Sequence, residues 1–186
     1  MSLLPTVRRI VTGHNEKGEA IFDSDTQLAP YNPATPTPDP AKQGETGFTS
    51  VFRTSGAPAD CNKPWIDIHN QTVELADKAG TTLRIVDFAP GIPGLMHRTV
   101  SLDFAIVLNG EIELELDNGV TKMVKQHDIV VQRGTIHSWN NKSSENVRML
   151  FALLPSDPVK SGDKELESTP LPKFLLGKAG NENASL

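Results

Sequence analysis

Two segments of the sequence carry side chains that could move protons or bind a metal ion. The first has polar residues at every second position: His97, Thr99, Ser101 and Asp103. On an extended strand these positions share one face, provided that no bulge intervenes. Forty positions after His97, His137 and Trp139 share a face in the same way. Burial in an apolar cavity can shift the pKa values of carboxylate and imidazole groups towards neutrality, as proton transfer requires.

The candidate residues would have distinct roles if the two segments face one cavity. For acid-base chemistry, Asp103 or His137 is expected to act as the base and His97 as the complementary acid. Four further residues are expected to contact the substrate: Thr99, Ser101, Trp139 and Arg133. Trp139 would form an apolar wall beside His137, and Arg133 would reach the mouth of the cavity. The alternative is that His97 and His137 are ordinary core histidines.

The elements that must position these residues resemble short β-strands. From Phe48 onwards, runs of β-forming residues recur at short intervals between Gly and Pro residues, which is typical of an antiparallel sandwich or barrel. In residues 111–116, Ile and Leu alternate with Glu, so one face is expected in the core and the other in water. Asp117-Asn118-Gly119 then supplies residues that tolerate the positive φ of a tight hairpin. We therefore predict an all-β fold.

The two ends of the chain differ from this central region. Residues 7–12 and 20–22 indicate a strand, a turn and a second strand. The next segment, 29–47, has five ring-locked residues that favour a surface loop: Pro30, Pro33, Pro36, Pro38 and Pro40. We divide the chain into an N-terminal β arm with a Pro-rich loop (1–47), a barrel (48–156) and a short C-terminal tail (157–186).

Both polar segments resemble the paired motifs of the cupin family. The first motif, Gly-x5-His-x-His-x3,4-Glu-x6-Gly, resembles the spacing of Gly91, His97, Asp103 and Gly110. The second, Gly-x5-Pro-x-Gly-x2-His-x3-Asn, resembles the spacing of Asp128, Gly134, His137 and Asn141. With their connecting hairpin the motifs cover residues 83–154, and two motifs in the right order are stronger evidence than either alone. The resemblance implies a cupin double-stranded β-helix, which is a jelly-roll barrel.

Departures from these motifs bear on metal binding. Thr99 stands where cupins usually have a second histidine, Asp103 replaces the usual glutamate, and His127 stands where glycine is expected. Gln132-Arg133 occupies the place of the usual proline. Of four customary ligands, the chain keeps His97, Asp103 and His137. These could form a two-histidine, one-carboxylate site for iron, or a zinc site completed by water. A site without a cofactor is the alternative, because Asp is one methylene shorter than Glu.

Composition limits the partners and the location of the protein. Its 186 residues suit one domain with a core. The net charge is -5, and 18 Lys and Arg residues are scattered among 23 acidic ones, so nucleic acid is not an expected partner. The single cysteine, Cys61, forms no intramolecular disulfide, and no apolar stretch has the length of a signal peptide or a membrane span. We expect a cytoplasmic protein with no membrane partner.

Small single-domain cupins, which the chain resembles, often accompany secondary-metabolite pathways. Without a metal the remaining chemistry is acid-base, so we predict a lyase or isomerase that acts on a small, largely apolar carbonyl or phenolic substrate. One alternative is a metal-dependent oxidoreductase with His97, Asp103 and His137 as ligands. Another is a non-catalytic cupin that binds a small ligand. We also expect a homodimer, because barrels of this family commonly pair.

Overall fold

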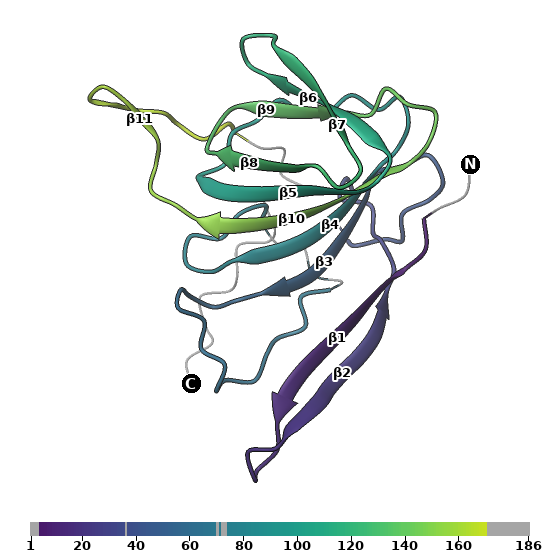
Figure 1. The fold of residues 1–186 in the computed structure, drawn as a ribbon, viewed down its shortest axis with the longest axis vertical. Helices are drawn as coiled ribbons and strands as arrows, with labels where there is room; N and C mark the ends of the chain where they lie inside the picture. The colour runs from purple at the N-terminus through teal and green to yellow at the C-terminus, as the bar shows by residue number, and fades with distance from the viewer. Residues whose placement is uncertain (1–3, 36, 70, 72–73, 171–186) are drawn as a thin grey trace.

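The protein is built from antiparallel β-strands (Figure 1). The computed structural model describes residues 4–35, 37–69, 71 and 74–170, and these residues form strands, turns and loops without a helix. The strands, in chain order, are β1 Val7–His14, β2 Ala20–Leu28, β3 Gly47–Arg53, β4 Thr82–Phe88, β5 Ser101–Asn109, β6 Glu111–Leu116, β7 Thr121–Lys125, β8 Ile129–Arg133, β9 His137–Asn140, β10 Val147–Pro155, β11 Lys160–Ser161 and β12 Lys164–Glu165. This confirms the all-β prediction. Within the described part of the chain, no helix is long and apolar enough to cross a membrane.

Two sheets form the barrel. One has five strands in the order β3-β4-β10-β5-β8, and the other has three in the order β7-β6-β9. The chain crosses between the two sheets at the β5–β6, β7–β8, β8–β9 and β9–β10 connections, so β8 and β9 each lie in the sheet opposite to both of their neighbours in sequence. In Figure 1 the three-stranded sheet lies at the upper end of the stacked strands β3, β4, β10, β5 and β8. The jelly-roll architecture that the two motifs predicted is confirmed.

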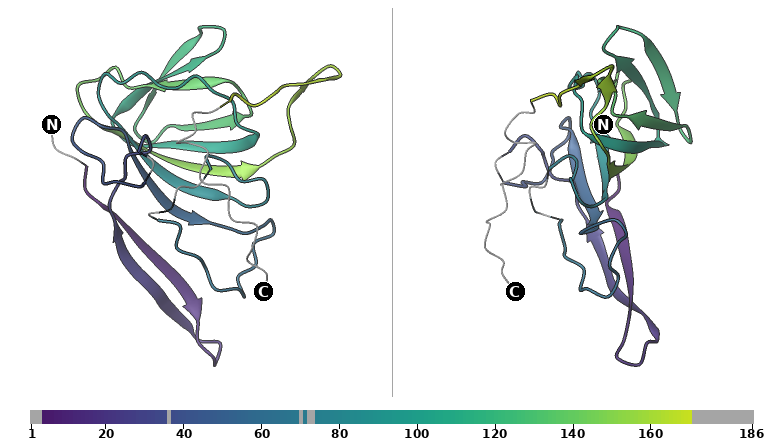
Figure 2. Two further views of the ribbon diagram at one scale, coloured as in Figure 1. Left: turned by 180° about the vertical axis from the view of Figure 1, so that it is seen from behind. Right: turned by 90° about the vertical axis from the view of Figure 1, so that its left-hand side faces the viewer.

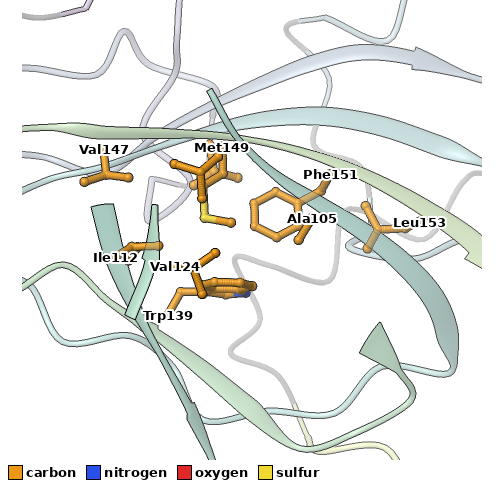
Figure 3. Packing of buried hydrophobic residues seen from close by; sticks show 10 residues of the cluster. Ala105, Ile112, Val124, Trp139, Val147, Met149, Phe151 and Leu153 are labelled. Atoms are coloured by element: carbon orange, nitrogen blue, oxygen red, sulfur yellow. The ribbon is translucent and has the colours of Figure 1, made fainter. Parts of the chain in front are cut away.

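Alternation of buried and exposed side chains fills the space between the sheets. In β10, Val147, Met149, Phe151 and Leu153 point inwards and are all buried. They pack with inward residues of both sheets, including Ile112 and Val124, as Figure 3 shows. Val147 and Met149 lie in solid core, whereas Phe151 and Leu153 border a cavity. The core therefore supports one end of the cavity.

The N-terminal hairpin projects away from the barrel. Among the strands that the structure describes, β1 and β2 pair only with each other, and their turn lies far from the barrel in Figures 1 and 2. Arg9 anchors the hairpin: its guanidinium is buried and donates to both carboxylate oxygens of Asp67, at 2.8 and 2.7 Å. The same guanidinium donates to the Val51 carbonyl oxygen and lies 4.7 Å from the centre of the Trp65 ring. One side chain thus joins the arm to β3 and to the loop that follows it.

The Pro-rich connection was expected to lie on the surface, but part of it packs against the barrel edge. Tyr31 is only 5% exposed, and its hydroxyl lies 3.0 Å from the hydroxyl of Ser50. Its backbone exchanges two hydrogen bonds with Phe48 of β3, both 2.8 Å long. β3 is an edge strand, and these bonds satisfy backbone groups that would otherwise be open to pairing with another chain.

Candidate active site

A cavity of about 260 Å³ lies between the two sheets. Most of its wall is apolar, with contributions from Phe48, Val86, Phe88, Trp139, Phe151 and Leu153. The polar side chains in the wall include Arg84, His97, Thr99, Asp103, Gln132 and His137. A small number of polar groups in an apolar cavity is the usual composition of a small-molecule site.

His97 and His137 converge in this cavity. Their backbones form an isolated antiparallel bridge in which His97 N donates to His137 O at 2.9 Å and His137 N donates to His97 O at 3.0 Å. The centres of the two imidazole rings are 4.7 Å apart. The period-two patterns of the two segments therefore lead to one place, although forty positions separate the residues.

Hydrogen bonds to the backbone fix the tautomers of both rings. Nδ1 of His97 lies 2.8 Å from the Leu95 carbonyl oxygen, and Nδ1 of His137 lies 3.0 Å from the Thr135 carbonyl oxygen. Because a carbonyl only accepts, each Nδ1 carries the proton and each Nε2 is left as an acceptor. Burial lowers the pKa of His97, while burial and the neighbouring His97 lower the pKa of His137 to about 4. Both rings are therefore neutral at pH 7.

Asp103 lies in the opposite sheet, on β5, and is 4% exposed. Burial raises its pKa to about 6, and a hydrogen bond from the Ser101 hydroxyl offsets part of that rise. Its Oδ1 atom has no hydrogen-bond partner among the described residues. A carboxyl group with this pKa can both take up and release a proton near neutral pH.

The loop before His97 is clamped against β9. Gly94 N donates to Asn140 Oδ1 at 3.0 Å, and Gly91 N donates to the Asn141 carbonyl oxygen at 3.0 Å. Asn141 is buried, and its side-chain amide donates to the Phe88 carbonyl oxygen at 2.9 Å. These bonds fix the wall of the cavity on the side of the two histidines.

The residues expected to contact a substrate divide into two groups. Thr99 and Trp139 line the cavity, and the Trp139 ring lies 6.3 Å from the His137 ring, centre to centre. Ser101 lies outside the described lining and bonds instead with the hydroxyl of Thr99 at 2.7 Å. The expectation that Arg133 reaches the cavity mouth is wrong. Arg133 is exposed on the outer face of β8, because alternation along this strand turns its neighbour Gln132 inwards.

Two polar residues of the cavity wall, Gln132 and Arg84, were not predicted from the sequence. Gln132 is 3% exposed and is the cross-strand partner of Asp103. Arg84 is 2% exposed, donates to the Glu74 carbonyl oxygen at 3.0 Å, and stacks over Phe48, 5.1 Å from the ring centre. Burial lowers the Arg84 pKa, and nearby Tyr31 partly opposes this effect. A charged residue inside the apolar run 83–86 was the available signal for Arg84.

The predicted three-ligand metal set of His97, Asp103 and His137 is not assembled. Two neighbouring Nε2 atoms could bind one ion, but in the described residues no group of three His, Cys, Asp or Glu side chains lies close enough to hold a metal. The two histidines meet at the β9 side of the cavity, whereas Asp103 lies on β5 of the other sheet. Thr99 stands at the position of the missing histidine and offers only a hydroxyl. The residues present therefore do not fit the iron or zinc site that we considered.

Comparisons with known proteins find relatives that match most of the chain. The chain is 35% identical over 171 residues to the phomopsin biosynthesis cluster protein C' of Diaporthe leptostromiformis, covering 88% of this chain and 86% of the relative. It is 32% identical to the cupin-domain-containing oxidoreductase fogC of Aspergillus ruber, covering 88% and 80% of the two chains. The Schizosaccharomyces pombe Cnp3 cupin domain is 16% identical with a TM-score of 0.45, covering 83% of this chain and 86% of that one. No family model matches the sequence. On the identity and coverage of these relatives, the chain belongs to the family of cupin-domain proteins found in fungal biosynthesis clusters.

Proposed function

We propose that the protein is an enzyme of the lyase or isomerase type, acting on a small, largely apolar carbonyl or phenolic compound by proton transfer. The observation that carries the proposal is Asp103, a buried carboxyl group with its pKa raised to about 6 in the wall of an apolar cavity. Two imidazoles that are neutral at pH 7 line the same cavity. Perturbed titratable groups in a largely apolar cavity favour catalysis over passive binding.

The pKa shifts of Asp103 and His97 support the following proposed steps. The Asp103 carboxylate removes a proton from the carbon next to the substrate carbonyl, and the electron pair of the broken C–H bond moves towards the carbonyl oxygen. The resulting Asp103 carboxylic acid then returns the proton, either to another carbon in an isomerisation or to a departing hydroxyl in a dehydration. His97 was expected to be the acid, but its lowered pKa leaves it without an acidic proton at pH 7. Nε2 of each histidine is instead left as an acceptor for a donor group elsewhere on the substrate.

The rate of proton abstraction should rise with pH and reach a plateau above pH 6. Only the Asp103 carboxylate is a base, so kcat/KM should fall about tenfold per unit as the pH drops below 6. Incubation of the protein with small hydroxy ketones in D₂O, at pH 5 to 8, measures exchange of the α-hydrogens by NMR. A rate that is flat through pH 6, or no exchange above the buffer rate, would contradict the proposal.

The names of several relatives favour a second candidate function, an oxidoreductase. The Aspergillus ruber relative is named a cupin-domain-containing oxidoreductase. Its metal-dependent form would use His97, Asp103 and His137, which the structure does not bring together as one set. Treatment with EDTA separates the two candidates. We expect α-hydrogen exchange to survive the chelator, whereas turnover that requires restored iron would favour the oxidoreductase.

We also propose that the protein is a homodimer. The outer face of the β5–β8 pair is apolar and open to solvent, with Phe104 36%, Val131 52% and Ile129 64% exposed. The projecting hairpin exposes apolar side chains too, including Phe22 at 80%. A two-stranded hairpin is marginal in water, and a second copy would cover both surfaces with one two-fold arrangement.

We further propose that the protein is located in the cytoplasm. The thiol of Cys61 is exposed, and a free exposed thiol suits a reducing compartment.

Val131→Lys should convert this dimer into a monomer, because it places an ammonium group in the centre of the apolar face. Light scattering at micromolar concentration measures the mass. Val120→Lys is the matched control, since Val120 is 53% exposed but lies outside that face. A wild-type protein with the mass of one chain would refute the dimer.

A further inference from the structure

Gln132 is a buried amide in the cavity wall that has no hydrogen-bond partner in the described part of the chain. It is 3% exposed, and neither Nε2 nor Oε1 has a hydrogen-bond partner among the residues described. Its cross-strand partner is Asp103. The Oδ1 atom of Asp103 is also buried and has no hydrogen-bond partner among those residues. Directly opposed residues have Cβ atoms about 5 Å apart. Two polar side chains thus lie side by side in the wall, and three of their polar atoms have no partner within the described ranges.

Such groups call for an explanation, because nearly all buried polar side chains in folded proteins have partners. The amide could have donated to the carboxylate of Asp103, yet it does not. The indole Nε1 of Trp139, which is 4% exposed and belongs to the same cavity wall, is a third polar group without a partner in the described structure. The cavity therefore offers two donors and two acceptors that a bound molecule can satisfy.

We infer that Gln132 and Asp103 together select substrates with a carbonyl and a hydroxyl group close together on an apolar framework, of which a β-hydroxy ketone is the simplest case. The Gln132 amide donates to the carbonyl oxygen, and Asp103 accepts from the hydroxyl. Phe88, Phe151 and Leu153 pack against the apolar remainder. This inference rests on the proposed function and specifies its substrate class.

The chemistry of that class balances without any further reactant. Asp103 takes the proton from the carbon between the two oxygen-bearing carbons, and the Gln132 N–H stabilises the charge that develops on the carbonyl oxygen. The electron pair then forms the C=C bond as the C–O bond to the hydroxyl breaks. The hydroxyl leaves with the proton that Asp103 returns. The products are an unsaturated ketone and water, with no net oxidation.

Binding of two matched probes tests the inference. 4-Hydroxy-4-phenylbutan-2-one has both oxygen groups, and 4-phenylbutan-2-one lacks the hydroxyl. Titrations followed by NMR should show that the wild-type protein binds the first at least tenfold more tightly. Gln132→Leu should weaken binding of both ketones about tenfold or more, since both use the carbonyl contact. Gln43→Leu is the control, because Gln43 is exposed. Equal binding of the two ketones by the wild type, or no binding, would overturn the inference.

Two further measurements, the unfolding temperature and α-hydrogen exchange, separate the binding role of Gln132 from a role in the fold and from the proposed reaction. Removing an amide without partners breaks no bond, so Gln132→Leu should unfold at the same temperature as the wild type or higher. A clearly lower temperature would show that Gln132 is bonded within the fold and would overturn the inference. If the wild type exchanges α-hydrogens and Gln132→Leu binds both ketones unchanged, the inference fails while the proposed function stands. If Gln132→Leu weakens binding but the wild type exchanges nothing, the proposed function fails and the binding role stands.

Discussion

Asp103→Asn is expected to lower α-hydrogen exchange by about 10²–10⁴-fold, the usual contribution of a general acid or base. Asparagine has nearly the same shape, so it keeps the packing but can neither take nor return a proton. The affinity for the hydroxy ketone should change much less than the rate. A rate loss without a matching loss of affinity is the sign of a group that acts in the transition state.

The same substitution should make the folded protein more stable at pH 7.5. Burial raises the Asp103 pKa from its ordinary value of 3.8 to about 6, so between these values the folded state binds more protons than the unfolded state. Stability therefore falls as pH rises through this window, by about 2–3 kcal/mol in all. Asparagine removes this penalty. Unfolding in urea at pH 7.5 should show the gain, and at pH 4 most of it should be gone.

Two comparisons keep this test specific. His137 changes the stability in the opposite direction with pH, because its lowered pKa destabilises the fold as pH falls from 6.5 towards 4. This effect is present in both the wild type and Asp103→Asn, so it cancels in the comparison. Asp163→Asn is the matched control, since Asp163 is exposed. It should change neither the rate of α-hydrogen exchange nor the stability at pH 7.5. An Asp103→Asn protein that exchanges at the wild-type rate would remove Asp103 from the mechanism. One that is less stable at pH 7.5 would show that the carboxylate is well bonded.

Gly94→Ala is expected to damage the site through the backbone. A Cβ at Gly94 would overlap the hydroxyl of Ser138 and the backbone carbonyl oxygen of Trp139, and the carbonyl cannot retreat without moving β9. Overpacking of this kind costs about 1–3 kcal/mol. The resulting shift separates the loop before His97 from His137, and displacements of about 1 Å can reduce turnover about 10²-fold.

Thermal unfolding and the exchange assay measure both effects on Gly94→Ala. Gly56→Ala is the control, because a Cβ there would meet only the Pro58 carbonyl oxygen at 3.8 Å, an ordinary contact. If Gly94→Ala keeps the stability and exchange rate of the wild type, the loop does not need its close approach to β9.

Much of the histidine wall could be predicted from the sequence, because it depends on local alternation. His97, Thr99 and Asp103 belong to a period-two series with Ser101, and all but Ser101 line the cavity. The same period brings His137 and Trp139 inwards. The glycine expected at position 127 had a backbone role: His127 takes its place with a φ of 74°, a conformation that favours glycine. The two motifs, in the right order, were therefore enough to predict the barrel and the convergence of the two imidazoles.

The tertiary structure alone determined which polar side chains point into the cavity and which protonation state each titratable group has. Val130 and Val131 are both apolar, so the sequence of β8 does not show whether Gln132 or Arg133 points inwards; pairing with β5 settles this. Whether three ligands share one centre depends on distances across two sheets, and here Asp103 lies apart from the histidines. Its raised pKa comes from burial by residues distant in sequence. Alternation is a property of one strand, whereas desolvation and ligand geometry are properties of the whole barrel.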